Sequence, residues 1–368
     1  MHVPDGFINA PVSVAAGVAA AGAVAVSLRG ARRELDERTA PLAGLMAAFI
    51  FAVQMLNFPV AAGTSGHLLG GALAAILVGP YTGVLCVTVV LLMQGILFAD
   101  GGLTALGVNV LDMGVTTTVV AYVVFRVLMR ALPRRRSTVT VASFVAALVS
   151  VPAAAVVFTL IYWIGGTTDI SIGKVFTAMV GVHVLIGIGE AVITAATVGA
   201  VIAVRPDLVH GARGFANPLK LRVDGQLIDA APAAPAKAAK PAKAPKPAVA
   251  VGSRSTRGLL AAGLLTALVL AGFVSYYASS SPDGLEKVAA DKGIDRNAKE
   301  HASADSPLAD YGVKDVDDAR LSGGLAGVIG VGVTVVVGGT VFWAIRRRRT
   351  DGADLTAGPA AVPLAEKV

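Results

Sequence analysis

The first two residues and one loop histidine carry the groups best suited to bind a transition metal. The chain starts Met1-His2, and a free α-amine, the His2 backbone nitrogen and the His2 imidazole can hold one ion through consecutive donor atoms. His67, in a loop of small residues, could supply a fourth nitrogen. Four nitrogens from such a tether favour a planar arrangement, which is typical of Ni(II) or Cu(II) and is reachable by Co(II).

This chelate requires a free amine on Met1. The first residues lack the basic region of a cleaved signal peptide, and a bulky residue at position 2 protects the initiator Met, so we expect the mature chain to begin at Met1. The simpler alternative is that His2 is a solvated terminal residue and His67 a hydrogen-bonding loop residue. The spacing leaves both interpretations open.

Membrane-spanning helices must position these residues. Hydrophobic residues make up 55% of the 368 and charged residues only 15%, against about 25% in typical soluble domains. The net charge of +7 comes from short basic clusters between long uncharged runs, which excludes nucleic acid as a partner. The one cysteine, Cys86, lies in an apolar run and offers neither a disulfide nor a thiolate metal site. The composition predicts an all-α, polytopic helix bundle in a lipid bilayer.

Crossing a bilayer takes about 20 apolar helical residues. Apolar runs occupy residues 8–28, 42–60, 68–98, 106–129, 139–164, 175–204, 258–278 and 323–345. The third run contains Gly79-Pro80, a helix-breaking pair, so it predicts two passes near 68–79 and 81–98, the first of them short. We therefore expect seven spans before residue 205 and two after it.

The distribution of basic residues predicts the orientation. Clusters follow the first, fifth, seventh and ninth spans and precede the eighth; they contain Arg29, Arg32, Arg33, Arg38, Arg130, Arg134 to Arg136, Arg205, Lys237, Lys240, Lys243, Lys246 and Arg346 to Arg349. With the N-terminus outside, every cluster and the C-terminus lie in the cytoplasm, as the positive-inside rule requires. His2 and His67 then share the outer side of the cell membrane.

Composition also divides the chain into four parts. Residues 1–204 form the seven-span module, and 205–257 form a flexible cytoplasmic linker rich in Ala, Pro and Lys. Residues 258–345 form a two-span module with an acidic exterior loop, and 346–368 form a cytoplasmic tail.

Some residues within the apolar runs are candidates for further roles. Asn109, Asp112, His183 and Glu190 are polar groups inside predicted spans, where a proton or cation relay and hydrogen bonds between helices are the two interpretations. Ala15, Ala19 and Ala23 make a small-residue face on the first span, suited either to docking on a partner helix or to packing inside the bundle.

The motifs resemble those of a known family. The N-terminal Met-His-Val-Pro-Asp-Gly-Phe, the segment from Gly66 to Gly71 and the segment from Gly107 to Gly114 are similar to the CbiM/NikM family, the substrate-binding membrane components of energy-coupling-factor transporters for cobalt and nickel. Family members often carry Asn where this chain has Asp112. The run Ser-Pro-Asp-Gly-Leu-Glu from Ser281 resembles the PDGLE domain of the small CbiN/NikN subunit, here fused through the linker.

The resemblance implies a function and a set of partners. Met1, His2 and His67 would bind Co²⁺ or Ni²⁺ as the transported substrate, with cobalt for cobalamin synthesis favoured over nickel and with no permanent cofactor. An energy-coupling transmembrane subunit and ABC ATPase subunits would be the partners, and the PDGLE module would assist metal loading. No GxxxxGK followed by Ser or Thr occurs, so ATP hydrolysis is expected in other chains, and this subunit is not expected to be an enzyme.

Two rival functions remain at this stage. One is an ion-coupled secondary transporter that works through His183, Glu190 and Asp112 and needs no ATPase. The other is a membrane scaffold or sensor, for which metal binding would be incidental.

Overall fold

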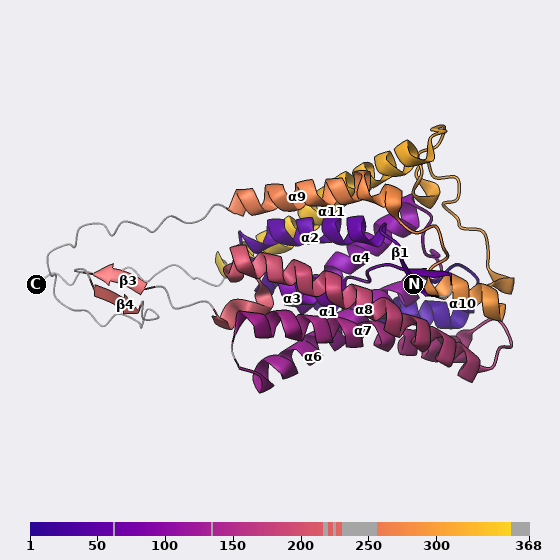
Figure 1. Cartoon of the computed structure of the whole chain (residues 1–368), viewed down its shortest axis with the longest axis horizontal. Coiled ribbons are helices and arrows are strands. Elements are labelled where there is room, and N and C mark those ends of the chain that lie inside the picture. Colours follow the sequence, from indigo (N-terminus) through magenta and orange to yellow (C-terminus); the bar gives the residue numbers. More distant parts are fainter. Residues whose placement is uncertain (62, 134, 216–219, 224–225, 230–255, 355–368) are drawn as a thin grey trace, which may run out of the picture.

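The computed structural model describes residues 1–368 except 62, 134, 216–219, 224–225, 230–255 and 355–368. Its described part is a bundle of roughly aligned helices (Figure 1). The helices of the first module are α1 (Ala10–Glu34), α2 (Thr39–Gln54), α3 (Gly71–Val78), α4 (Pro80–Leu97), α5 (Leu106–Asn109), the π-helical η1 (Val110–Thr116), α6 (Thr117–Ala131), α7 (Arg136–Gly165) and α8 (Ile172–Val204). The polytopic, all-helical class predicted from the composition is confirmed.

The remaining elements are shorter or belong to the second module. They are β1 (Phe58–Ala61), β2 (Thr64–Gly66), η2 (Pro206–Leu208), η3 (His210–Phe215), β3 (Lys220–Val223), β4 (Gln226–Asp229), α9 (Thr256–Gly272), η4 (Val274–Tyr277), α10 (Gly284–Lys292), η5 (Ile294–Asn297), η6 (Ala309–Tyr311) and α11 (Ala319–Asp354). β1 pairs with β2, and β3 with β4, both antiparallel.

Seven helices in the described part of the chain are long and apolar enough to cross a membrane. They correspond to seven of the nine predicted spans. The predicted span at 42–60 corresponds to the 16-residue α2, which is shorter than the others. The predicted pass over 68–79 is short, as expected, but its start needs correction, because the eight-residue helix α3 begins only at Gly71 and follows a non-helical segment.

The break between α3 and α4 occurs where the sequence predicts it. Gly79 adopts φ +107° and ψ 156°, a conformation that L side chains rarely take, and Pro80 starts the next helix. A Cβ at Gly79 would also lie 2.6 Å from the Glu34 carboxyl carbon. The turn therefore needs glycine for both conformation and space.

The second module packs on α2 through its two long helices, which lie beside α2 at the edge of the bundle (Figure 1). Gly44 of α2 sits against the backbone of α11, since a Cβ there would be 2.9 Å from the Gly339 nitrogen. Such close approach of small residues stabilises helix pairs in membranes. The two modules share one hydrophobic core.

Part of the predicted linker packs against the first module. Leu208, Val209 and Ala212, in and beside η2 and η3, are buried in the core. The strands β3 and β4 also fall within 205–257 and were not predicted from the sequence. Residues 230–255 of the predicted linker and 355–368 of the predicted tail lie outside the described residues.

Both modules contribute to one end of the bundle, which we call the site end. It holds Met1, the β1–β2 hairpin and α10, whereas α1 and α6 finish at the opposite end with Arg32, Arg33 and Arg130 in their last turns (Figure 1). This arrangement agrees with the predicted segregation of basic residues to one side of the membrane.

Candidate metal centre

The N-terminal amine is buried between two side chains at the site end. The amine nitrogen of Met1 lies 2.6 Å from Nε2 of His67 and donates a hydrogen bond of 2.7 Å to Oδ2 of Asp283. Met1 is only 3% exposed. Two nitrogens at about 2 Å from one ion and at right angles to each other are separated by about 2.8 Å. The spacing of the amine and His67 is therefore close to that of neighbouring ligands on a single ion.

His2 lies beside His67 with its ring stacked on the other, and the ring centroids are 5.1 Å apart. Its Nδ1 is 3.2 Å from Oδ1 of Asp100, and its Nε2 is 3.1 Å from Oε1 of Gln94. Burial lowers the pKa of His2 to about 4, an effect that Asp100 opposes and the Met1 amine reinforces. The imidazole is therefore neutral at physiological pH, which is the form that binds metals.

The residues after His2 are fastened to the first module. The backbone N–H of Val3 donates to Oδ1 of Asn109 at 2.7 Å, and the Asn109 amide donates back to the Val3 carbonyl at 3.2 Å. Asp5 accepts hydrogen bonds from the backbone N–H groups of Leu103 and Thr104. These bonds fix the direction in which the chain presents its first two residues.

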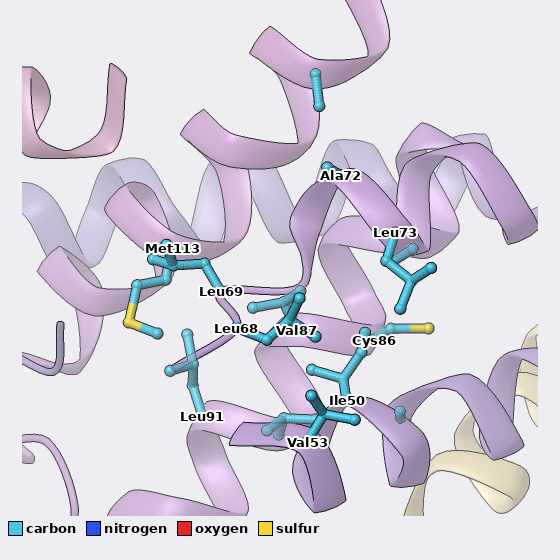
Figure 2. Close-up of a cluster of buried hydrophobic side chains, with 14 of the residues drawn as sticks. Ile50, Val53, Leu68, Leu69, Ala72, Leu73, Cys86, Val87, Leu91 and Met113 are labelled. Atoms are coloured by element: carbon cyan, nitrogen blue, oxygen red, sulfur yellow. The ribbon is translucent and has the colours of Figure 1, made fainter. Parts of the chain in front are cut away.

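His67 is held by the segment that follows it. Leu68 and Leu69 are inserted in the core among side chains of α2, α4 and η1 (Figure 2). The backbone N–H groups of Leu69 and Gly70 donate to the Glu190 carboxylate at 2.6 and 3.2 Å. These are the residues just before α3, where backbone donors lack intrahelical partners. Glu190 therefore anchors the segment that carries His67.

Asp283 enters from the second module as the N-cap of α10. Its Oδ1 accepts from the backbone N–H of Glu286 at 2.9 Å, and the Glu286 side chain accepts from the Asp283 N–H at 2.8 Å, which makes a capping box. Its Oδ2 faces the Met1 amine and lies 3.5 Å from Nε2 of His67. Burial alone raises the pKa of this carboxyl, but the amine and His67 beside it hold the pKa well below its usual range.

A cavity of about 520 Å³ between the two modules leads to these groups. Carboxylates from both modules line it together with His2 and His67; they belong to Asp100, Asp283, Glu286 and Asp310. Tyr311 closes one side and donates a 2.6 Å hydrogen bond to Asp100. Burial, with the nearby Asp100 carboxylate, raises the pKa of Tyr311 well above its usual value, so the hydroxyl stays a donor. Fixed negative charge in a cleft raises the local concentration of cations.

The structure brings Met1, His2 and His67 close together, while their role as metal ligands stays a prediction. The other candidates lie on other elements of the bundle. Asn109 contacts the N-terminal segment rather than another span. His183 is buried near Met1 and His67, bonded through Nδ1 to the Met179 carbonyl. Neither carboxylate oxygen of Asp112 has a hydrogen-bond partner among the described residues.

The small-residue face on α1 points away from the bundle. Ala15 and Ala19 are exposed and Ala23 is half-buried, whereas the neighbouring Ala16 and Ala20 are buried. Val14 and Val18 are also exposed, at 66% and 70%. The face therefore remains available for lipid or for a partner helix.

Four polar residues of the site were missed at the level of sequence. They are Asp5, Gln94, Asp100 and Asp283. Gln94 and Asp100 lie within hydrogen-bonding distance of His2, and Asp283 accepts a hydrogen bond from the Met1 amine. Asp5 accepts one from the backbone N–H of Thr104 in the neighbouring loop. Asp5 and Asp283 stand inside the two motifs that carry the family resemblance, which was a usable signal. Gln94 and Asp100 have no such signal, because only the fold brings them to His2.

The fold is that of a membrane-spanning helical bundle, and its buried imidazoles beside an acidic cavity are a candidate site for a transition metal. Residues 2–208 match the family described as the cobalt uptake substrate-specific transmembrane region, CbiM, and residues 257–347 match the PDGLE domain. The chain belongs to the CbiM family and carries a fused PDGLE module.

Similar proteins and a solved structure agree with this family assignment. A provisionally named fused nickel transport protein NikMN of Archaeoglobus fulgidus is 39% identical over 212 residues, which cover 57% of this chain and 68% of the relative. The cobalt transport protein CbiM of Sorangium cellulosum is 35% identical over 192 residues, 51% of this chain and 84% of the relative. A crystal structure described as a transition metal transporter superposes with a TM-score of 0.50 at 25% identity, covering 59% of this chain and 98% of the other.

Proposed function

We propose that this chain is the substrate-capturing subunit of an energy-coupling-factor importer for Co²⁺ or Ni²⁺, in the cell membrane, with the site end facing outward. The ligands would be the Met1 amine, the His2 backbone nitrogen and imidazole, and His67. The observation that carries the proposal is the 2.6 Å approach of the buried amine to Nε2 of His67. On loading, Nδ1 of His2 would exchange its contact with Asp100 for the metal.

The energy for transport is proposed to come from partner chains. The subunit would capture the ion, dock with a coupling transmembrane subunit and ABC ATPases, and release the ion to the cytoplasm. The exposed face of Ala15 and Ala19 is the proposed docking surface, since small residues allow close helix approach. In this cycle the protein itself catalyses no covalent step.

The donor set does not distinguish the two ions. A planar set of nitrogen ligands suits Ni(II), and Co(II) can also adopt it. The names of the similar proteins divide between nickel and cobalt. The preference for cobalt stays a prediction, and a competition measurement with both ions on the purified chain would decide it.

One residue added before Met1 tests the chelate. It would move the α-amine away from His67 and convert the Met1 nitrogen into an amide, so we expect high-affinity Ni²⁺ binding, measured by calorimetry, to be lost together with uptake. The control is one residue added after Val368 at the other end of the chain. Unchanged binding by the N-terminally extended chain would overturn the proposal.

A further inference from the structure

A carboxylate of the second module reaches the first residue of the chain. Asp283 accepts a 2.7 Å hydrogen bond from the Met1 amine, across 282 positions of sequence. The amine side of the pair is 2% exposed and the Asp283 side chain 11%. The contact is therefore a buried ion pair that joins the two modules at the proposed metal ligands.

Several hydrogen bonds determine where this carboxylate lies. The Ser65 backbone N–H donates to the Pro282 carbonyl at 2.9 Å, and the Ser65 hydroxyl donates to the Ser281 carbonyl at 2.7 Å. Ser65 belongs to β2, two residues before His67. The strand that leads to His67 thus also holds the residue before Asp283.

The next residue allows the close approach. A Cβ at Gly284 would lie 2.8 Å from the Ile186 side chain and 3.2 Å from the His183 ring. A larger residue would push α10, and its N-cap Asp283, away from α8. The glycine thereby keeps the carboxylate within reach of the amine.

The pair has an electrostatic consequence for the amine before an ion binds. A charged amine taken out of water needs a counter-charge, and burying an unpaired one is strongly unfavourable. Asp283 is the carboxylate that the described structure places on it. To bind a metal, the ammonium must first give up one proton to water; the ion then holds the amine nitrogen in place, and the carboxylate is needed less.

We propose that Asp283 is a positioning residue, whose carboxylate holds the Met1 amine beside His67 before an ion binds and so keeps the chelate ready to load. This inference rests on the proposed function. It gives the second module a specific chemical role: it raises the fraction of empty sites that can accept an ion. The apparent affinity of a site scales with that fraction, so loading depends on Asp283 more strongly than release does.

The variant Asp283→Asn isolates the charge. Asparagine is also a good N-cap, so α10 is retained, but its amide N–H₂ would face the amine in place of an oxygen. We expect the rate of Ni²⁺ loading to fall by about tenfold or more. We expect the rate of Ni²⁺ release to change by less than about threefold.

The measurement uses the purified full-length chain, with Ni²⁺ loading followed by stopped flow and release followed after addition of a chelator. Asp291→Asn is the matched control, because it removes one charge from the same helix at an exposed position that, within the described part of the chain, pairs only with Lys287. If the Asn variant does not fold, Asp283→Ser provides a second uncharged N-cap. The melting temperature of each empty variant shows that the fold is kept.

Loading at the wild-type rate, or tighter binding in the variant, would overturn the inference. An equal rise in release would do so too, because it would make Asp283 a ligand of the bound ion. Failure of the proposed function looks different, since the wild-type chain would then bind no Ni²⁺ at all.

Discussion

The metal centre has two halves that are built differently. In the first module, hydrogen bonds of Val3 and Asp5 to the rest of the bundle hold the N-terminal segment. Hydrogen bonds to Glu190 and packing in the core hold the segment after His67. The second module contributes one carboxylate, held by an N-cap and by bonds to β2. On the proposals above, the first half determines how slowly a bound ion is released, and the second determines how readily the site takes one up.

The largest effect on the first half is expected from Asn109→Leu. The change keeps the branching at Cγ but removes both hydrogen bonds to Val3, so His2 loses its fixed direction. Loss of such supporting partners typically lowers metal affinity by about 10- to 100-fold. Calorimetry with Ni²⁺ on the full chain measures it.

The release rate sharpens the comparison for this variant. We expect Asn109→Leu to speed release, unlike Asp283→Asn, because it disturbs the loaded chelate as well as the empty one. A variant with normal affinity and normal release would show that the bonds to Val3 are dispensable. The division of the site into two halves would then fail.

A smaller effect is expected from Glu190→Gln. The glutamine amide has one oxygen that accepts hydrogen bonds and one NH₂ group that cannot. One of the two backbone N–H groups before α3 therefore loses its acceptor, at a cost of about 1–3 kcal/mol in stability. We expect a lower melting temperature and a few-fold loss of Ni²⁺ affinity, with uptake retained.

Asp112→Asn is the matched comparison, since Asp112 is equally buried but has no hydrogen-bond partner among the described residues. We expect it to leave affinity and uptake nearly unchanged. Abolished uptake with intact Ni²⁺ binding in both variants would favour the ion-coupled secondary transporter instead.

The sequence predicted the architecture well where long apolar runs and basic clusters dominate. It also predicted the break at Gly79-Pro80, because both residues act locally. It also predicted that the helix before this break is short, but not that the residues leading into α3 are non-helical. The residues before α3 bond to Glu190, more than 100 positions away, and such a contact leaves no local signal.

The sequence also predicts only the part of the candidate site whose signal is local. The amine, His2 and His67 could be recognised because their chemistry is carried by residue type and position. Asp100, Gln94 and Asp283 could not, since each meets the N-terminus only through the folded bundle. Asp283 in particular stands in a motif whose contact partner lies at the far end of the chain.

The most direct test of the central claim is X-ray absorption spectroscopy at the nickel edge on the loaded, full-length chain. The account predicts a planar shell of four nitrogens at about 2 Å from the ion, at least one of them from imidazole and with no carboxylate oxygen. A six-coordinate, oxygen-rich shell, or one that loses an oxygen in Asp283→Asn, would contradict it.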